Sequence, residues 1–321
     1  MSLLAAMFGV GVEVRNALYD RQWLKSRRLS GPVVSIGNLS TGGSGKTPFV
    51  ILFGELLKAR GVPFDVLSRG YGRQTKGVRV VDPGGSARDF GDEPLLIARR
   101  LEVPVVVGED RYAAGRVAEE KFGVRLHLLD DGFQHRALAR DFDIVLVTPE
   151  DARDRLLPVG RLREPPAALK RAHAVVLTSG ADSTRFPLEG KLVWRARRGI
   201  VPAGVPQQPV AFCGIARPQS FFLQLRAAGI TPAAEAVYRD HHAYTKEDVR
   251  ELLALREHGG AGGFVTTEKD AVNLGGLLSA LQPLAVVPVR MELEEAQAAV
   301  ESVLRVASGE GRAASGAGSD H

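Results

Sequence analysis

The chain has 321 residues, of which 45% are hydrophobic, so it can bury a core and form two domains of ordinary size. Its 42 basic and 37 acidic side chains give a net charge of +5, and no nucleic-acid-binding motif accompanies this mild excess, so we expect no nucleic-acid partner. Cys213 is the only cysteine, which excludes an intramolecular disulfide and a cysteine zinc cluster and fits a reducing cytoplasm.

The N-terminal segment begins with an apolar run at residues 3–12, which as a helix is about 15 Å long and too short to span a bilayer. No basic residue precedes this run, contrary to a signal peptide. Apolar positions continue as far as Trp23 and Leu24, interspersed with basic side chains. We therefore predict that residues 1–31 form an amphipathic, membrane-associating helix. The alternative is a helix that packs on the protein's own core.

The following segment alternates between short β-branched runs and apolar-periodic stretches, a pattern typical of a parallel sheet with helices on both faces. Strands are expected at residues 33–37, 64–68, 103–107, 126–129, 144–147 and 174–178, and helices at residues 47–60, 93–101 and 111–122.

Residues 40–47 read Ser-Thr-Gly-Gly-Ser-Gly-Lys-Thr between an expected strand and an expected helix, the context of a P-loop. The first glycine of the usual motif is Ser40 here. Glycines allow backbone N–H groups to surround phosphates, Lys46 would reach the β- and γ-phosphates, and Thr47 would ligate Mg²⁺. The predicted nucleotide-binding residues are Thr41, Gly42, Gly43, Ser44, Gly45, Lys46 and Thr47.

Two adjacent carboxylates, Asp130 and Asp131, follow the strand expected at residues 126–129. Acidic residues at the carboxyl end of a strand beside a P-loop are placed to hold a metal, so we predict that this pair binds Mg²⁺. Asp-Asp-Gly is also an ordinary turn sequence, and the division of roles between the two carboxylates stays open.

The C-terminal part is predicted to form a second, smaller α/β domain over residues 191–306, with a connecting strand at 191–197. Residues 32–190 would be a P-loop kinase domain, and 307–321 a disordered tail rich in Gly, Ser and Ala. The expected fold class is thus α/β, with a P-loop NTPase-like parallel sheet and a second α/β domain. Further strands are expected at 210–213, 263–266 and 285–289, and helices at 220–228 and 246–258.

Seven phrases in one order resemble the tetraacyldisaccharide 4′-kinase family of lipid A biosynthesis. They lie at residues 35–48, 68–73, 91–94, 130–135, 163–165, 240–242 and 267–270. The resemblance implies Mg²⁺-dependent transfer of the ATP γ-phosphate to the 4′-hydroxyl of a tetraacylated glucosamine disaccharide 1-phosphate, a glycolipid, giving lipid IVA. It also implies a peripheral position on the cytoplasmic face of the bacterial inner membrane, with no obligate protein partner.

Catalytic roles follow from the same resemblance. Asp92 is the candidate base for the sugar hydroxyl, and His241 would orient it, although His242 is adjacent. Because the two residues lie in different expected domains, they would meet only across a cleft that closes on substrate. Asp92 could instead be a helix N-cap, and the histidine a solvated loop residue.

The remaining site predictions concern charge and substrate. Arg163 could stabilise the transferring phosphoryl group and Glu164 could support the metal, or the two could be a surface ion pair. Arg69 could bind the substrate phosphate and Tyr71 could pack on a sugar ring. Asn38 is a weaker candidate for substrate contact. The Thr-Glu-Lys-Asp phrase at 267–270 fails as a guanine-binding motif because its lysine is one position late.

Two other functions remain open at the sequence level. A soluble P-loop enzyme acting on a small metabolite would need no apolar N-terminal helix. A nucleotide-dependent switch would bind a partner without turning over an acceptor.

Overall fold

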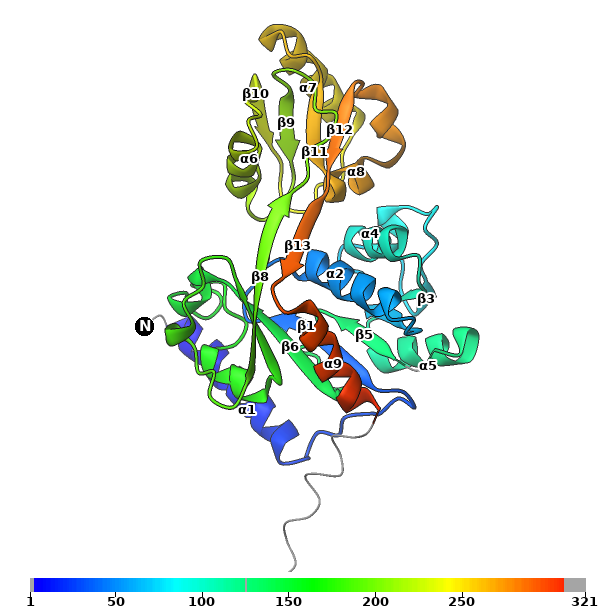
Figure 1. The fold of residues 1–321 in the computed structure, drawn as a ribbon, viewed down its shortest axis with the longest axis vertical. Coiled ribbons are helices and arrows are strands. Elements are labelled where there is room, and N and C mark those ends of the chain that lie inside the picture. Colours follow the sequence, from blue (N-terminus) through cyan, green and yellow to red (C-terminus); the bar gives the residue numbers. More distant parts are fainter. Residues whose placement is uncertain (1–2, 125, 309–321) are drawn as a thin grey trace, which may run out of the picture.

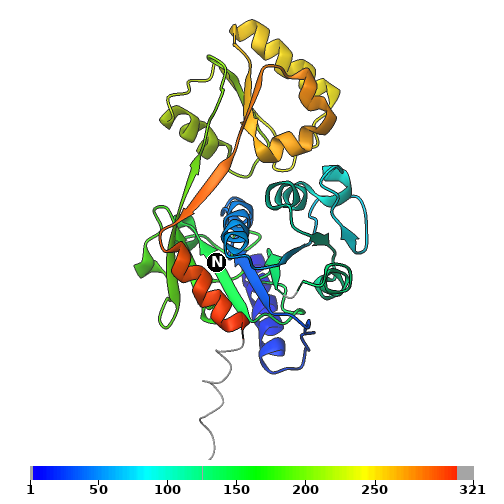
Figure 2. The same ribbon diagram turned by 45° about the vertical axis from the view of Figure 1, so that its right-hand side comes forward.

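The computed structural model describes residues 3–124 and 126–308. Within these residues the strands form two sheets, one of nine strands in the order β13-β8-β7-β6-β1-β5-β2-β4-β3 and one of four in the order β10-β9-β11-β12. Figures 1 and 2 show the smaller sheet with its helices standing above the larger one. We call the nine-stranded sheet with its helices the large unit, and residues 201–288 the small unit. The α/β fold class is confirmed.

The large unit carries most of the elements expected from the sequence. Its strands are β1 (Val33–Asn38), β2 (Asp65–Ser68), β3 (Arg79–Val80), β4 (Val105–Val107), β5 (His127–Asp130), β6 (Phe142–Val147), β7 (Ala174–Thr178), β8 (Leu192–Ile200) and β13 (Val289–Leu293). Its α-helices are α1 (Leu3–Asp20), α2 (Lys46–Ala59), α3 (Ala87–Phe90), α4 (Asp92–Leu101), α5 (Arg111–Phe122) and α9 (Ala296–Ala307), and 3₁₀ turns lie at Pro149–Ala152, Pro166–Arg171 and Ser183–Arg185.

The central strands are buried on both faces, which explains their continuous apolar runs. One face packs against α2, α4 and α9, with Phe49, Phe53 and Val300 in the same buried cluster. The opposite face packs against α5 near Ala114 and Ala118. Since β1 and β5 are parallel neighbours, their carboxyl ends lie together at the edge where α2 begins.

The small unit contains β9 (Val210–Cys213), β10 (Ala234–Val237), β11 (Phe264–Thr267), β12 (Leu284–Val287), α6 (Pro218–Ala227), α7 (Lys246–Gly259), α8 (Glu268–Leu274) and the 3₁₀ turn Gly275–Ala280. Its sheet is parallel throughout. Helix α6 packs on one face and α7 and α8 on the other, so the unit has its own core.

Sheet membership differs from the ranges expected for the second domain. β8 pairs with β7 along Leu192–Ala196, and β13 pairs antiparallel with β8, so both strands belong to the large sheet. Helix α9 also packs on the large unit. The range 191–306 expected for the second domain therefore includes β8, β13 and α9, which belong to the large unit. Figure 1 shows β8 and β13 as the ribbon of two strands that connects the units.

The N-terminal helix lies against loops of the large unit and exposes an apolar face. Leu3, Leu4, Met7, Val10 and Val14 are 53–76% exposed. No helix among the described residues is long and apolar enough to cross a membrane. Of the tail predicted at 307–321, residues 309–321 lie outside the described part of the chain.

Candidate active site

The P-loop joins the end of β1 to the start of α2. Gly42, Gly43 and Gly45 have φ of 67°, 68° and 88°, a backbone conformation that favours glycine. Lys46 and Thr47 open α2, so free N–H groups at the helix start face the loop. This geometry suits a bound phosphate chain.

Asn38 shapes this loop from within the sheet. Its Nδ2 donates to the Ser40 carbonyl oxygen at 2.7 Å and to Ser44 Oγ at 2.8 Å, and its Oδ1 accepts from Lys46 Nζ at 3.0 Å. The side chain is fully buried. In this structure Asn38 therefore positions P-loop residues, and the substrate contact expected from the sequence stays a prediction.

The acidic pair lies beside the P-loop because β5 neighbours β1, with Asp130 opposite Ile36. Asp130 is buried, its Oδ2 accepts from Ser68 Oγ at 2.9 Å, and its Oδ1 has no partner among the described residues. Burial, followed by the charges of Glu93 and Asp131, raises the pKa of Asp130 to about 7. The unpartnered buried oxygen, on the strand next to the one that leads into the P-loop, fits a Mg²⁺ ion that is held with nucleotide phosphates.

Asp131 points toward basic groups. Its carboxylate accepts from Arg163 Nη1 at 2.8 Å and lies 3.5 Å from Lys46 Nζ. Burial alone would raise the pKa of Asp131, but Lys46 and Arg163 outweigh it and lower the pKa to about 2. The pKa values of the two carboxylates are therefore shifted in opposite directions. No group of three or more metal-ligating side chains gathers within residues 3–124 and 126–308, and Mg²⁺ needs none when phosphates supply its other ligands.

Asp92 and His241 meet across the two units. Asp92 is the first residue of α4 and is 3% exposed, and its Oδ2 lies 2.9 Å from His241 Nδ1. Asn273 Nδ2 also donates to this oxygen at 3.0 Å. His241 has a φ of 103°, which is a strained conformation for a residue other than glycine. Such strained residues are concentrated at functional sites. The pair is thus assembled in this structure, and His242 instead contacts Asp248.

Lys269 is a member of this cluster that the sequence did not reveal. Its Nζ lies 3.0 Å from His241 Nε2, 3.3 Å from Asp240 Oδ1 and 3.4 Å from Glu93 Oε1. Lysine can only donate, so Nε2 accepts, and a neutral His241 carries its proton on Nδ1 and donates it to Asp92.

The pKa shifts of the pair follow from these contacts. Burial would raise the pKa of Asp92, but His241 and then Lys269 lower it below its ordinary value. Burial would lower the pKa of His241, but Asp92 raises it and Lys269 opposes the rise. A charged imidazolium would set two N–H groups against each other at the 3.0 Å contact with Lys269, so the contact geometry favours the neutral ring.

Glu164 is not directed at the acidic pair. It is 2% exposed, Arg171 binds both of its oxygens at 2.9 Å, and Asn16 of α1 donates to one of them at 2.7 Å. The expected metal role of Glu164 therefore finds no support here, because its oxygens are occupied by a buried ion pair. Its neighbour Arg163 does reach the pair, through Asp131.

A basic cluster lies at the same edge of the sheet. Arg111, the first residue of α5, is 5% exposed, and its Nε has no partner among the described groups. Burial and then Arg69 lower its pKa. Burial, followed by Arg111 and Arg140, lowers the pKa of His135 to about 4. No functional role was predicted for Arg111 or His135 from the sequence. The position of Arg111 after β4, whose carboxyl end lies at this edge, is the signal that could have indicated one.

Tyr71 contacts the His241 ring of the Asp92–His241 pair. It is 65% exposed, and its ring centroid lies 5.2 Å from that of His241 in an edge-on arrangement. An exposed aromatic face beside the candidate base is suited to packing on a sugar ring.

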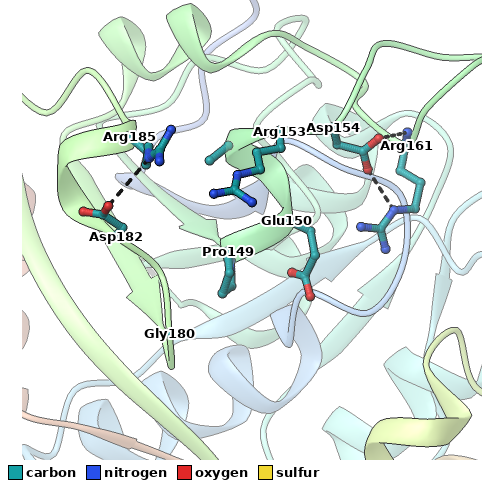
Figure 3. Close-up of a pocket in the computed structure, with 9 residues that line it drawn as sticks. Pro149, Glu150, Arg153, Asp154, Arg161, Gly180, Asp182 and Arg185 are labelled. Atoms are coloured by element: carbon teal, nitrogen blue, oxygen red, sulfur yellow. Dashed lines mark hydrogen bonds and ion pairs between the residues drawn. The ribbon is translucent and has the colours of Figure 1, made fainter.

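A cavity of about 640 Å³ is formed by the loops after β6 and β7. It therefore lies on the β6–β7 side of β1, whereas the acidic pair follows β5 on the opposite side. Figure 3 shows Glu150 and Arg153 pointing into it and the pairs Asp154–Arg161 and Asp182–Arg185 at its sides. The Arg161 carbonyl accepts from the Thr41 N–H at 2.8 Å, so this cavity adjoins the P-loop.

A glycine loop that opens a helix, next to a buried carboxylate on the neighbouring parallel strand, defines the class of P-loop nucleotide-binding enzymes. The family model described as tetraacyldisaccharide-1-P 4′-kinase matches residues 1–307. The chain belongs to this family and is a kinase, as the sequence motifs indicated.

The chain is similar to curated relatives and to a solved structure over nearly its whole length. It is 52% identical to tetraacyldisaccharide 4′-kinase from Koribacter versatilis over 95% of this chain and 98% of the relative. It is 39% identical to the enzyme of that name from Geobacter metallireducens over 95% and 97%. A crystal structure of LpxK from Aquifex aeolicus in complex with ATP covers 95% of this chain and 97% of its own, at 34% identity and a TM-score of 0.78.

Proposed function

We propose that the protein transfers the γ-phosphate of Mg-ATP to the 4′-hydroxyl of a tetraacylated glucosamine disaccharide 1-phosphate. The observation that carries this proposal is the common edge of the sheet at which the P-loop, the acidic pair and the Asp92–His241 pair lie, in a chain of the 4′-kinase family. ATP in the related LpxK structure supports the choice of phosphate donor.

The mechanism uses alignment and charge more than covalent chemistry. The P-loop N–H groups and Lys46 hold the phosphates, while Thr47 and Asp130 would hold Mg²⁺, which neutralises phosphate charge when bound. Asp92 accepts the proton of the attacking hydroxyl, and His241 keeps the carboxylate in position through its Nδ1–H. Arg163, held by Asp131, supplies positive charge toward the transferred group.

The basic cluster of Arg69, Arg111 and His135 supports a binding site for the substrate 1-phosphate. Arg111 is buried with an unpartnered Nε, which an anion would satisfy. Tyr71 would pack on the sugar ring whose hydroxyl faces Asp92. The cavity after β6 and β7 would take the adenosine, since it lies across the P-loop from the acceptor side.

Helix α1 supports attachment to the cytoplasmic face of the inner membrane. Four of its exposed apolar side chains, at positions 3, 7, 10 and 14, recur at spacings of four and three, and Leu4 lies three positions before Met7, so all five lie on one face. Trp23 is 72% exposed just beyond the helix, and Arg21 and Lys25 are exposed beside it. An apolar face flanked by aromatic and basic groups is suited to the surface of an anionic bilayer.

The test is transfer of the γ-phosphate into detergent-dispersed tetraacyldisaccharide 1-phosphate by the wild type, Lys46→Ala and Asp92→Ala. The proposal expects transfer by the wild type and losses of roughly 10²-fold or more in both variants. A folded, ATP-binding wild type that transfers no phosphate to lipid would instead indicate an enzyme of small metabolites or a nucleotide switch. The N-cap position of α4 is held by Gly91, so transfer that survives in Asp92→Ala would leave Asp92 with a structural role in the first turn of this helix.

A further inference from the structure

Asn273 is a half-buried side chain that forms a hydrogen bond with the candidate base. It lies on α8, and its Nδ2 donates to Asp92 Oδ2 at 3.0 Å. A carboxylate can only accept hydrogen bonds, so the amide nitrogen of Asn273 must face it. Asn273 follows the Thr-Glu-Lys-Asp phrase at 267–270 by three residues, so none of the seven family phrases includes it.

The two oxygens of Asp92 are held differently, and His241 alone does not account for the difference. His241 Nδ1 lies 2.9 Å from Oδ2 and 3.1 Å from Oδ1, so its proton is shared almost equally between them. Asn273 bonds to Oδ2, and Lys269 Nζ lies 3.9 Å from the same oxygen. Lys269 and Asn273 are four residues apart on α8, so one face of this helix directs both groups toward Oδ2.

This arrangement leaves Oδ1 as the oxygen that can receive a further proton. Each carboxylate oxygen offers about two acceptor sites, and the donors of His241 and Asn273 fill both sites at Oδ2. Oδ1 accepts the backbone N–H of Glu93 at 2.9 Å and has the longer of the two His241 contacts. The negative charge of the carboxylate is therefore compensated more at Oδ2 than at Oδ1.

We propose that Asn273 is a positioning residue that fixes the orientation of Asp92, so that Oδ1 accepts the proton of the sugar hydroxyl. The O–H bond of the acceptor breaks as the H–Oδ1 bond forms. The hydroxyl oxygen then bonds to the γ-phosphorus, and the P–O bond to ADP breaks with its electron pair remaining on ADP. This inference rests on the proposed function, because it requires Asp92 as the base.

The surroundings of Asp92 determine what the loss of Asn273 does. Burial raises the pKa of Asp92, and His241, Lys269 and the Asn273 hydrogen bond lower it. The charged or titratable groups that face this carboxylate, directly or through Lys269, are His241, Lys269, Glu93 and Asp240. Removal of the amide donor therefore raises the pKa of Asp92, and the base becomes protonated at a higher pH.

The experiment measures kcat and KM for detergent-dispersed tetraacyldisaccharide 1-phosphate across a range of pH. Asn273→Leu removes the donor with little change in side-chain size, and Asn273→Asp keeps the shape but turns a second carboxylate toward Asp92. Gln224→Leu is the matched control, since it removes an amide donor on α6 that bonds to Ser220. Thermal melting reports whether each variant folds, and Asn273→Asp carries the test should Asn273→Leu not fold.

Asn273→Leu is expected to lower kcat by roughly tenfold and to leave KM within about twofold, because the bond holds the base and not the substrate. The acid limb of kcat/KM should move to higher pH, and further in Asn273→Asp, whereas Gln224→Leu should match the wild type. A purely structural role would lower the melting temperature and leave the acid limb in place, and this result would overturn the inference.

Asp92→Ala in the same assay separates this inference from the proposed function. If Asp92→Ala transfers phosphate as fast as the wild type, Asp92 is not the base and the inference fails with that assignment. If Asp92→Ala is inactive while both Asn273 variants behave like Gln224→Leu, the inference alone is wrong.

Discussion

Glu164 and Arg171 form a buried ion pair that links α1 to the rest of the large unit through Asn16. The two side chains are 2% and 12% exposed, and the guanidinium of Arg171 also lies 4.5 Å from the centroid of the Phe133 ring. Removal of one partner leaves an uncompensated buried charge, which costs more than the loss of a surface pair.

Arg171→Ala is therefore expected to lower the free energy of unfolding by about 3 kcal/mol, measured by urea denaturation. The control is Arg250→Ala, whose ion pair with Glu247 is 63–70% exposed and contributes less than about 1 kcal/mol. Equal stability of the two variants would mean that the buried pair does not support the fold.

Lys269 lowers the pKa of both Asp92 and His241. Replacement by Met removes this positive charge, so both pKa values rise, and the base becomes protonated at a higher pH than in the wild type. The acid limb of the pH profile of kcat/KM should therefore move to higher pH in Lys269→Met and stay nearly in place in Lys269→Arg. An unchanged acid limb in Lys269→Met would show that Lys269 does not affect the pKa of the catalytic base.

The sequence best predicts which residues lie together where the local backbone determines their positions. Lys46 and the acidic pair lie together because a P-loop and the end of the adjacent strand are brought together by the parallel sheet. Lys269 could not be found in this way, since it contacts residues of the other unit that are far away in the sequence. Asn38 and Glu164 were assigned from motif position, but burial gives them other contacts.

Among the elements, α1 has an apolar face that no described part of the chain covers. Leu4→Glu with Met7→Glu places two charges on side chains that are each 63% exposed. The double variant should bind anionic phospholipid vesicles much more weakly in a sedimentation assay, while its melting temperature stays close to that of the wild type.

Leu223→Glu on α6 is the matched control for this helix, because Leu223 is 62% exposed on the small unit. It should leave vesicle binding unchanged. A similar loss in both variants would indicate a general effect of added negative charge, and no loss in the α1 variant would contradict the membrane assignment.

Most strands of both sheets were predicted within a few residues, because β-branched runs bounded by turn residues can be recognised in the sequence. The strands β3, β10 and β13 and the helices α3, α8 and α9 were not predicted. β13 alternates between buried and exposed residues at a sheet edge, and α9 is rich in alanine, so neither carries a strong apolar run. Strand order depends on long-range pairing, which is why the ranges of the two units were misjudged.

At the scale of the whole molecule, Asp92 and His241 come from different units, and their role as one pair depends on how the units sit together. Residues that act as a unit give non-additive losses. Asp92→Asn and His241→Ala are each expected to lower kcat, and the double variant should be no slower than the slower single variant. Losses that multiply in steady-state kinetics would show that the two residues act independently.

The two connections to the small unit leave the large sheet side by side. Ile200 and Val289 are register partners in the antiparallel β8–β13 pair, with the whole small unit between them in the sequence. One tight turn at this point would close the two strands into a hairpin and keep their pairing in the host sheet. The small unit, which carries His241, thus has the form of a module inserted into a host domain, which a deletion between these two strands could remove without unravelling its host.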